Sequence, residues 1–245
     1  MKTKHLLITS LVILSIVFIG LQLMQYEMLA SFTRASILVL LVLIYGIKRE
    51  NINNYFFMFL TTFALADLIG LSYWYFISQP ETSFDYVYFI CNGLYILSYL
   101  FLIIKVLKSI DIKDVIIKLP AHIVILLVLD IFCVTIVTDT TKAEFDVYHY
   151  ALEFLYNTVI MSLLTLSVIN YIYKVGKKAM NLLVGSLFIV FSETIQLTYY
   201  YILEDNNLLN VLCSFFFIIA FLFFYVYSNQ EETEELQLFN EHIEA

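Results

Sequence analysis

The sequence has few of the residues that shape soluble proteins. Only 14% of its 245 residues are charged, and it contains two prolines and six glycines. An ordinary soluble domain has roughly a quarter of its residues charged, so this composition excludes that class. The three cysteines, Cys91, Cys133 and Cys213, fall inside apolar segments without C-x-x-C spacing. We expect them to pack as small apolar residues rather than to form disulfides or bind metal.

The sequence also lacks the motifs of several enzyme classes. It has no Walker loop, no serine nucleophile elbow and no H-E-x-x-H segment, and its four histidines are scattered. Metal hydrolases need clustered ligands, so we expect no metal and no cofactor. The net charge of −8 owes much to six glutamates within residues 229–245, which solvate that segment. We therefore expect no nucleic-acid partner.

What the sequence does have is long apolar runs, since 62% of its residues are hydrophobic. A run of about 20 apolar residues is long enough to cross a bilayer as a helix. We predict an all-α polytopic membrane protein, with a transmembrane domain over residues 1–228 and an acidic cytoplasmic tail over residues 229–245. The eight predicted spans are residues 5–24, 29–47, 55–78, 87–107, 119–138, 149–173, 179–202 and 207–228.

The basic residues are sorted between alternate loops. Eleven of the 13 fall at the N-terminus or in the second, fourth and sixth loops, while Lys142 lies in an odd-numbered loop and Arg34 within a span. Basic residues concentrate on the cytoplasmic side of multi-pass proteins. We therefore predict a multi-pass protein of the cell (inner) membrane with both termini in the cytoplasm.

Two spans carry an acid in nearly the same local sequence. Residues Asp67–Tyr75 align with Glu193–Tyr201, with four identical and three conservative positions out of nine. Residues Cys91–Leu102 resemble Cys213–Phe224 in the spans that follow. The chain thus has the pattern of two parallel four-helix repeats. An acid within the membrane is costly, and we take Asp67 and Glu193 as the candidate catalytic residues.

Further polar residues lie within the predicted spans, in part at helical spacing, and they predict a polar cavity inside the bundle. The candidate substrate-binding residues are Arg34, Asn92, Tyr95, Tyr99, Asp130, Glu153, Tyr156 and Asn157. A structural interpretation stays open for several of them.

In that interpretation one of the two acids is salt-bridged to Arg34 and the other is protonated against a backbone carbonyl. Arg34 alone could instead extend its side chain toward the membrane surface. Asp130 would join two helices by a hydrogen bond, and Glu153 would lie at the water interface.

Two carboxylates in an apolar site suit acid–base chemistry. Burial and mutual repulsion favour a proton on one of them, while a neighbouring arginine favours the charged form of the other. The result is one proton donor and one anion, the pair that general acid–base catalysis requires. Glycosidases use such a pair to cleave a bond through an oxocarbenium-like species.

At these residues the chain resembles the YhhN family of lysoplasmalogenase-like integral membrane proteins. Phe63-Ala-Leu-Ala-Asp67-Leu-Ile resembles the family's third-span pattern L-x-x-G-D-x-x-L, and Phe188-Ile-Val-Phe-Ser-Glu193 resembles its seventh-span pattern F-x-x-S-D. Thr33-Arg34-Ala35 lies where the family has a basic residue, usually followed by proline, and Asn92–Tyr99 partly matches the fourth-span pattern. The chain departs from the family at Ala66, Tyr99 and Glu193, where glycine, histidine and aspartate are usual, and it lacks the proline.

The resemblance implies eight spans and hydrolysis of the vinyl-ether bond of lysoplasmalogens. One of Asp67 and Glu193 would protonate the alkenyl carbon, and the other would stabilise the oxocarbenium and guide water to it. Arg34 would hold the lipid phosphate or tune the pair. The partner would be a membrane lipid or lysolipid substrate.

Two other functions remain open from the residues. A small-molecule or proton-coupled transporter fits parallel repeats with acids inside the membrane, although no span is interrupted by proline or paired glycines. A non-catalytic membrane sensor or scaffold would use the acidic tail for docking.

Overall fold

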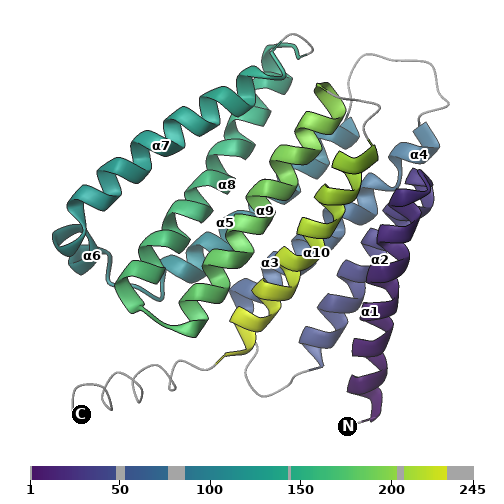
Figure 1. Cartoon of the computed structure of the whole chain (residues 1–245), viewed down its shortest axis with the longest axis horizontal. Coiled ribbons are helices and arrows are strands. Elements are labelled where there is room, and N and C mark those ends of the chain that lie inside the picture. Colours follow the sequence, from purple (N-terminus) through teal and green to yellow (C-terminus); the bar gives the residue numbers. More distant parts are fainter. Residues whose placement is uncertain (1, 48–52, 77–85, 143–144, 203–206, 231–245) are drawn as a thin grey trace.

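The computed structural model describes residues 2–47, 53–76, 86–142, 145–202 and 207–230, and within these ranges the secondary structure is helical (Figure 1). The helices are α1 (Lys2–Leu23), α2 (Glu27–Gly46), α3 (Asn54–Gly70), α4 (Tyr73–Phe76), α5 (Tyr86–Leu107), α6 (Ile112–Lys118), α7 (Pro120–Asp139), α8 (Val147–Lys174), α9 (Lys177–Tyr201) and α10 (Asn207–Asn229). The predicted all-α class is confirmed for the described residues. The glutamates of the predicted tail, at positions 231–244, lie outside them.

Seven of these helices are long and apolar enough to cross a membrane, so the chain is a multi-pass membrane protein. They are α1, α2, α5, α7, α8, α9 and α10. The remaining predicted span corresponds to α3, an apolar helix of 17 residues.

The third predicted span is interrupted near Asp67. Helix α3 ends at Gly70, and Ser72 tightens the turn because its amide donates to the Ile69 carbonyl at 2.9 Å and its hydroxyl donates to the same oxygen at 2.6 Å. The short helix α4 follows. Asp67 therefore lies three residues from a helix end, whereas Glu193 lies well inside α9.

Seven helices pack side by side in a closed ring. The contacts run from α1 to α2, α3, α5, α8, α9 and α10 and return from α10 to α1. Helix α7 packs on α8 outside this ring and forms one edge of the molecule (Figure 1). The start of α1 and the end of α10 lie at the same end of the bundle (Figure 1).

An aromatic core fills the ring between α3 and α10. Phe59 stacks on Phe221 with ring centroids 5.7 Å apart, and Phe63 meets Phe221 edge-on at 4.9 Å. These rings are almost completely buried. Aromatic pairs in these geometries add to the stability that burial provides, so this core holds α3 against α10 one turn from Asp67.

Asparagine and aspartate side chains cap the first turn of three helices, α3, α6 and α8. Asn53 accepts a hydrogen bond from the Phe56 amide at the start of α3, and Asp146 accepts from the amides of Tyr148 and His149 at the start of α8. Such caps satisfy amides that have no partner within the helix. None of the three cysteines forms a disulfide.

Candidate functional site

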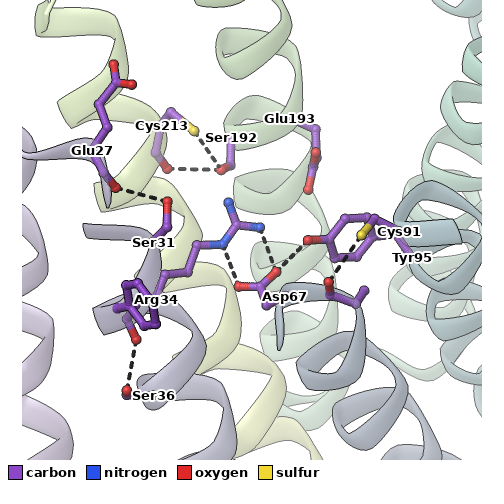
Figure 2. Close-up of polar contacts among 12 residues, drawn as sticks. Glu27, Ser31, Arg34, Ser36, Asp67, Cys91, Tyr95, Ser192, Glu193 and Cys213 are labelled. Atoms are coloured by element: carbon purple, nitrogen blue, oxygen red, sulfur yellow. Dashed lines mark hydrogen bonds and ion pairs between the residues drawn. The ribbon is translucent and has the colours of Figure 1, made fainter. Parts of the chain in front are cut away.

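Asp67 and Arg34 form an ion pair between α3 and α2. Arg34 Nη2 donates to Asp67 Oδ1 at 3.3 Å, and Nε lies 2.9 Å from Oδ2 in ion-pair contact without hydrogen-bond geometry (Figure 2). Tyr95 of α5 donates its hydroxyl to Asp67 Oδ1 at 2.5 Å. The Asp67 side chain is only 5% exposed, so a cation and a hydroxyl replace the water that it has lost.

The guanidinium of Arg34 is also held from a third helix. It lies over the ring of Phe217 on α10, with its central carbon 4.3 Å from the ring centroid. A cation over an aromatic face is attracted by the ring's quadrupole. Arg34 thus contacts both Asp67 and Phe217, and 19% of its side chain remains exposed.

Glu193 has a different set of partners. Its Oε1 accepts the hydroxyl of Tyr99 from α5 at 3.0 Å, and it also hydrogen bonds with Tyr156 from α8. Its side chain points toward the Arg34–Asp67 pair, with which it interacts electrostatically (Figure 2). No cation in the described ranges forms an ion pair with it.

The site draws one or two side chains from each of six helices in the ring. Its members are Arg34 (α2), Asp67 (α3), Tyr95 and Tyr99 (α5), Tyr156 (α8), Glu193 (α9) and Phe217 (α10). Except for Phe217, all were candidates from the sequence. The spacing of apolar residues gave no reason to single out one phenylalanine among 22.

Matching contacts flank the two acids. The carbonyl oxygen of Ala66, the residue before Asp67, accepts a hydrogen bond from the thiol of Cys91 at 3.4 Å. The residue before Glu193, Ser192, donates to the carbonyl of Cys213 at 2.9 Å (Figure 2). Cys91 and Cys213 are the aligned residues of the two similar segments, so α3 meets α5 much as α9 meets α10.

A second polar cluster lies beside the site, toward the loop between α7 and α8. Glu153 of α8 accepts the hydroxyl of Tyr88 at 3.2 Å on Oε2 and the amide of Asn157 at 3.3 Å on Oε1. Asn157 also donates to Thr138 of α7 at 3.1 Å. Glu153 is 6% exposed, so it is buried rather than at the water interface.

Tyr88 and Thr138 were not predicted as site residues. Tyr88 lies one turn before Asn92 and so extends the polar stripe of Asn92, Tyr95 and Tyr99. That spacing was available in the sequence. Nothing in the sequence distinguished Thr138 from the other threonines of its span.

Two candidate residues lie apart from the carboxylate pair. Asn92 donates to the Tyr88 carbonyl of its own helix at 2.9 Å. Asp130 accepts the hydroxyl of Thr165 at 2.8 Å between α7 and α8, which is the helix–helix hydrogen bond of the structural interpretation. Because α7 lies outside the ring, this contact serves α7 packing.

The arrangement makes the two carboxylates chemically unequal. Asp67 has an ion pair with Arg34 and a hydrogen bond from Tyr95, whereas Glu193 accepts from tyrosine hydroxyls and interacts with Arg34 electrostatically without forming an ion pair. Two carboxyl groups in environments as different as these are the arrangement that acid–base chemistry uses.

Among the described residues, no group of three or more histidine, cysteine, aspartate or glutamate side chains could hold a metal ion. In comparisons with known proteins, no family model, no curated protein and no solved structure matches the chain.

Proposed function

We propose that the chain is a membrane-embedded hydrolase that cleaves the vinyl-ether bond of a lysoplasmalogen. One observation carries the proposal: two carboxylates that interact electrostatically lie inside the ring of helices, one paired with an arginine and the other with tyrosine hydroxyls. The resemblance of the segments around Asp67 and Glu193 to the YhhN family supports the choice of this bond.

The proposed reaction begins with Glu193 as general acid. Its proton is transferred to the alkenyl carbon distant from the ether oxygen, and the resulting oxocarbenium is stabilised by the Asp67 carboxylate. Water adds to the cation and gives its proton to Asp67. The hemiacetal then collapses to a fatty aldehyde and a free glycerol hydroxyl, so that one water is consumed per bond cleaved.

Arg34 has a positioning role in this scheme. Its ion pair with Asp67 and its place over Phe217 leave it tuning the carboxylate rather than holding a lipid phosphate. Tyr99 and Tyr156 orient the acid on Glu193, and Tyr95 orients Asp67. The substrate's aliphatic chain would lie among the apolar side chains of the bundle.

We also propose eight spans in two parallel four-helix halves, with α3 as the third span. Its 17 residues fall at the lower end of the length that crosses a bilayer. The order α1–α2–α3–α5 and the order α7–α8–α9–α10 follow the same sequence of neighbours, and the Cys91 and Cys213 contacts occupy matching places.

The proposed orientation has both termini in the cytoplasm of a cell (inner) membrane. Eight crossings return the chain to its starting side, and α1 begins at the end of the bundle where α10 finishes (Figure 1). The basic residues of the even-numbered loops support the cytoplasmic assignment.

The deciding experiment measures aldehyde release from a lysoplasmalogen by the purified protein in detergent. Wild type is compared with Asp67→Asn and Glu193→Gln, and with Asp139→Asn as a control. Asp139 is an exposed carboxylate that accepts the Tyr150 hydroxyl at 2.9 Å at the end of α7. We expect release by wild type and control and a loss of about 10²–10⁴-fold in both site variants. Folded wild type that releases no aldehyde would overturn the proposal.

A proton-coupled carrier is the second candidate function. The matching contacts around Cys91 and Cys213 favour it, because parallel repeats around a site inside the membrane are common in transporters. Solute uptake into vesicles driven by a pH gradient, lost in Glu193→Gln and without aldehyde release, would favour the carrier over the enzyme.

A further inference from the structure

Glu153 is a buried acid that the reaction scheme leaves without a role. Its two oxygens accept from Tyr88 and Asn157, and no cation in the described part of the chain forms an ion pair with it. A carboxylate that is 6% exposed and lacks a counter-ion is expensive as a permanent charge. Its surroundings suit a group that takes up and releases a proton.

The position of Glu153 links Glu193 to the end of the bundle at the α7–α8 loop. On the inner side, Tyr156 follows Glu153 by three residues on the same helix face and hydrogen bonds with Glu193. Glu153 and Glu193 also interact electrostatically. The tyrosine hydroxyl can both accept and donate, as a group that passes a proton between two acids must.

On the outer side, the cluster reaches exposed titratable groups. The ring of Tyr88 packs on His149, one turn before Glu153, with centroids 5.0 Å apart. His149 Nδ1 lies 2.6 Å from Asp146 Oδ1, and the Asp146 side chain is 58% exposed. The titratable groups around Glu153 are thus Tyr88 from α5, His149 and Tyr156 from α8 and Glu193 from α9, with the neutral Thr138 of α7 behind Asn157.

We propose that Glu153 is a proton relay that reloads Glu193 from the aqueous side at the α7–α8 loop. This inference rests on the proposed function, in which Glu193 loses a proton to carbon while the proton of the added water goes to Asp67. Glu153 gives its proton to the Glu193 carboxylate through the Tyr156 hydroxyl or an intervening water. It takes a replacement proton from the side of His149 and Asp146, so the two transfers together leave the charge of Glu153 unchanged. Asp67 releases the proton of the added water to the aqueous phase, so that one proton enters and one leaves in each turnover.

The first test follows protonation and needs no turnover. After a rapid drop from an alkaline pH at which Glu193 has lost its proton, time-resolved infrared spectroscopy records the return of the carboxylic acid band of Glu193, identified by its loss in Glu193→Gln. We expect Glu153→Gln to slow the appearance of this band at least tenfold, whereas Asp139→Asn leaves it unchanged. Protonation of Glu193 at the wild-type rate in Glu153→Gln would overturn the relay.

The second test uses aldehyde release. Glu153→Gln keeps the shape and the acceptor of the side chain but cannot carry a transferable proton, so we expect kcat to fall at least tenfold with KM unchanged. A direct return of the proton from Asp67 to Glu193 would leave kcat unaffected and contradict the proposal. Tyr88→Phe, which removes only the outer hydroxyl, is the second variant should Glu153→Gln fail to fold, and we expect it to slow the infrared signal as well.

The two tests separate the possible failures. Wild type without aldehyde release, but with Glu193 protonation slowed in Glu153→Gln, would refute the hydrolase and retain the relay. Aldehyde release with wild-type protonation in Glu153→Gln would retain the hydrolase and refute the relay.

Discussion

Asp67 and Glu193 occupy matching places in two similar segments, yet they are stabilised by opposite means. Asp67 is held by a cation from α2 and a hydroxyl from α5, and Glu193 by hydroxyls from α5 and α8. The residues aligned with Tyr95 and Tyr99 in the second segment are Phe217 and Phe221, which have no hydroxyl. One of the two tyrosines at Glu193, Tyr99, therefore comes from the other half of the chain. The two aligned acids thus lie in different electrostatic environments.

The largest loss of stability is expected when the arginine that pairs with Asp67 is removed. We expect Arg34→Met to lower the free energy of unfolding by about 3 kcal/mol, because it leaves a buried carboxylate without its counter-ion. The double variant Arg34→Met/Asp67→Leu replaces the pair with apolar groups and should recover stability to within about 1 kcal/mol of wild type. Unfolding in detergent provides the measurement. Equal losses in the single and double variants would contradict the ion-pair account.

Substitution of Glu193 should have a smaller effect that depends on the replacement. Glutamine retains an oxygen that accepts from the tyrosines, so we expect Glu193→Gln to change the free energy of unfolding by less than about 1 kcal/mol. Leucine leaves two buried hydroxyls without an acceptor and should cost about 2 kcal/mol. The same unfolding assay applies. A glutamine variant as unstable as the leucine variant would indicate that Glu193 is charged in the folded protein.

The tyrosines should distinguish the two acids by a still smaller margin. Tyr95→Phe removes a hydrogen bond to a charged carboxylate and should cost about 2 kcal/mol, whereas Tyr99→Phe removes one to a neutral acid and should cost about 1 kcal/mol. Both variants keep the ring and its packing, and so each serves as the control for the other. The reverse order in thermal unfolding would show that the charge assignments are exchanged.

The smallest effect is expected at Asp146, an exposed carboxylate that caps the start of α8. Its hydrogen bond from the His149 amide, with the contact to the His149 ring, lowers the pKa of Asp146 below its usual range. Its stabilisation of the α8 start is therefore full above the usual aspartate range and is lost as the pH falls through the lowered pKa. Hydrogen exchange at the amides of Tyr148 and His149, corrected for intrinsic rates, reports this loss. Asp146→Asn retains a cap without a charge and should show no such pH dependence.

The class of the protein and most of the central site could be predicted from the sequence. Apolar runs identify membrane helices without any knowledge of packing, and an acid, an arginine or a tyrosine within such a run needs a partner. The sequence could not decide which partners Asp67 and Glu193 have, because the partners lie on other helices. The ion pair of Arg34 with Asp67 agrees with the structural interpretation, whereas the partners of Glu193 are tyrosine hydroxyls rather than a backbone carbonyl.

The sequence could not show that Asp130 lies apart from the site, because this depends on α7 packing outside the ring. Asp130 has the same sequence character as Asp67, a lone acid in an apolar run, but α7 packs mainly along α8. Neighbour relations of this kind arise from side chains far apart in the chain. For the same reason, the contacts of Phe217 with Arg34 and of Thr138 with Asn157 had no sequence pattern to indicate them.

The early end of α3 has a consequence for the lipid around it. A helix of 17 residues is about 25 Å long, against a hydrocarbon thickness of about 30 Å. In the proposed eight-span arrangement, this hydrophobic mismatch would draw the bilayer thinner beside α3. Asp67, three residues before the end of α3, would then lie close to the depth at which glycerol joins the lipid chains. A lysolipid could thus present its linkage to the carboxylate while its headgroup stays in the interfacial layer, without being lifted out of its leaflet.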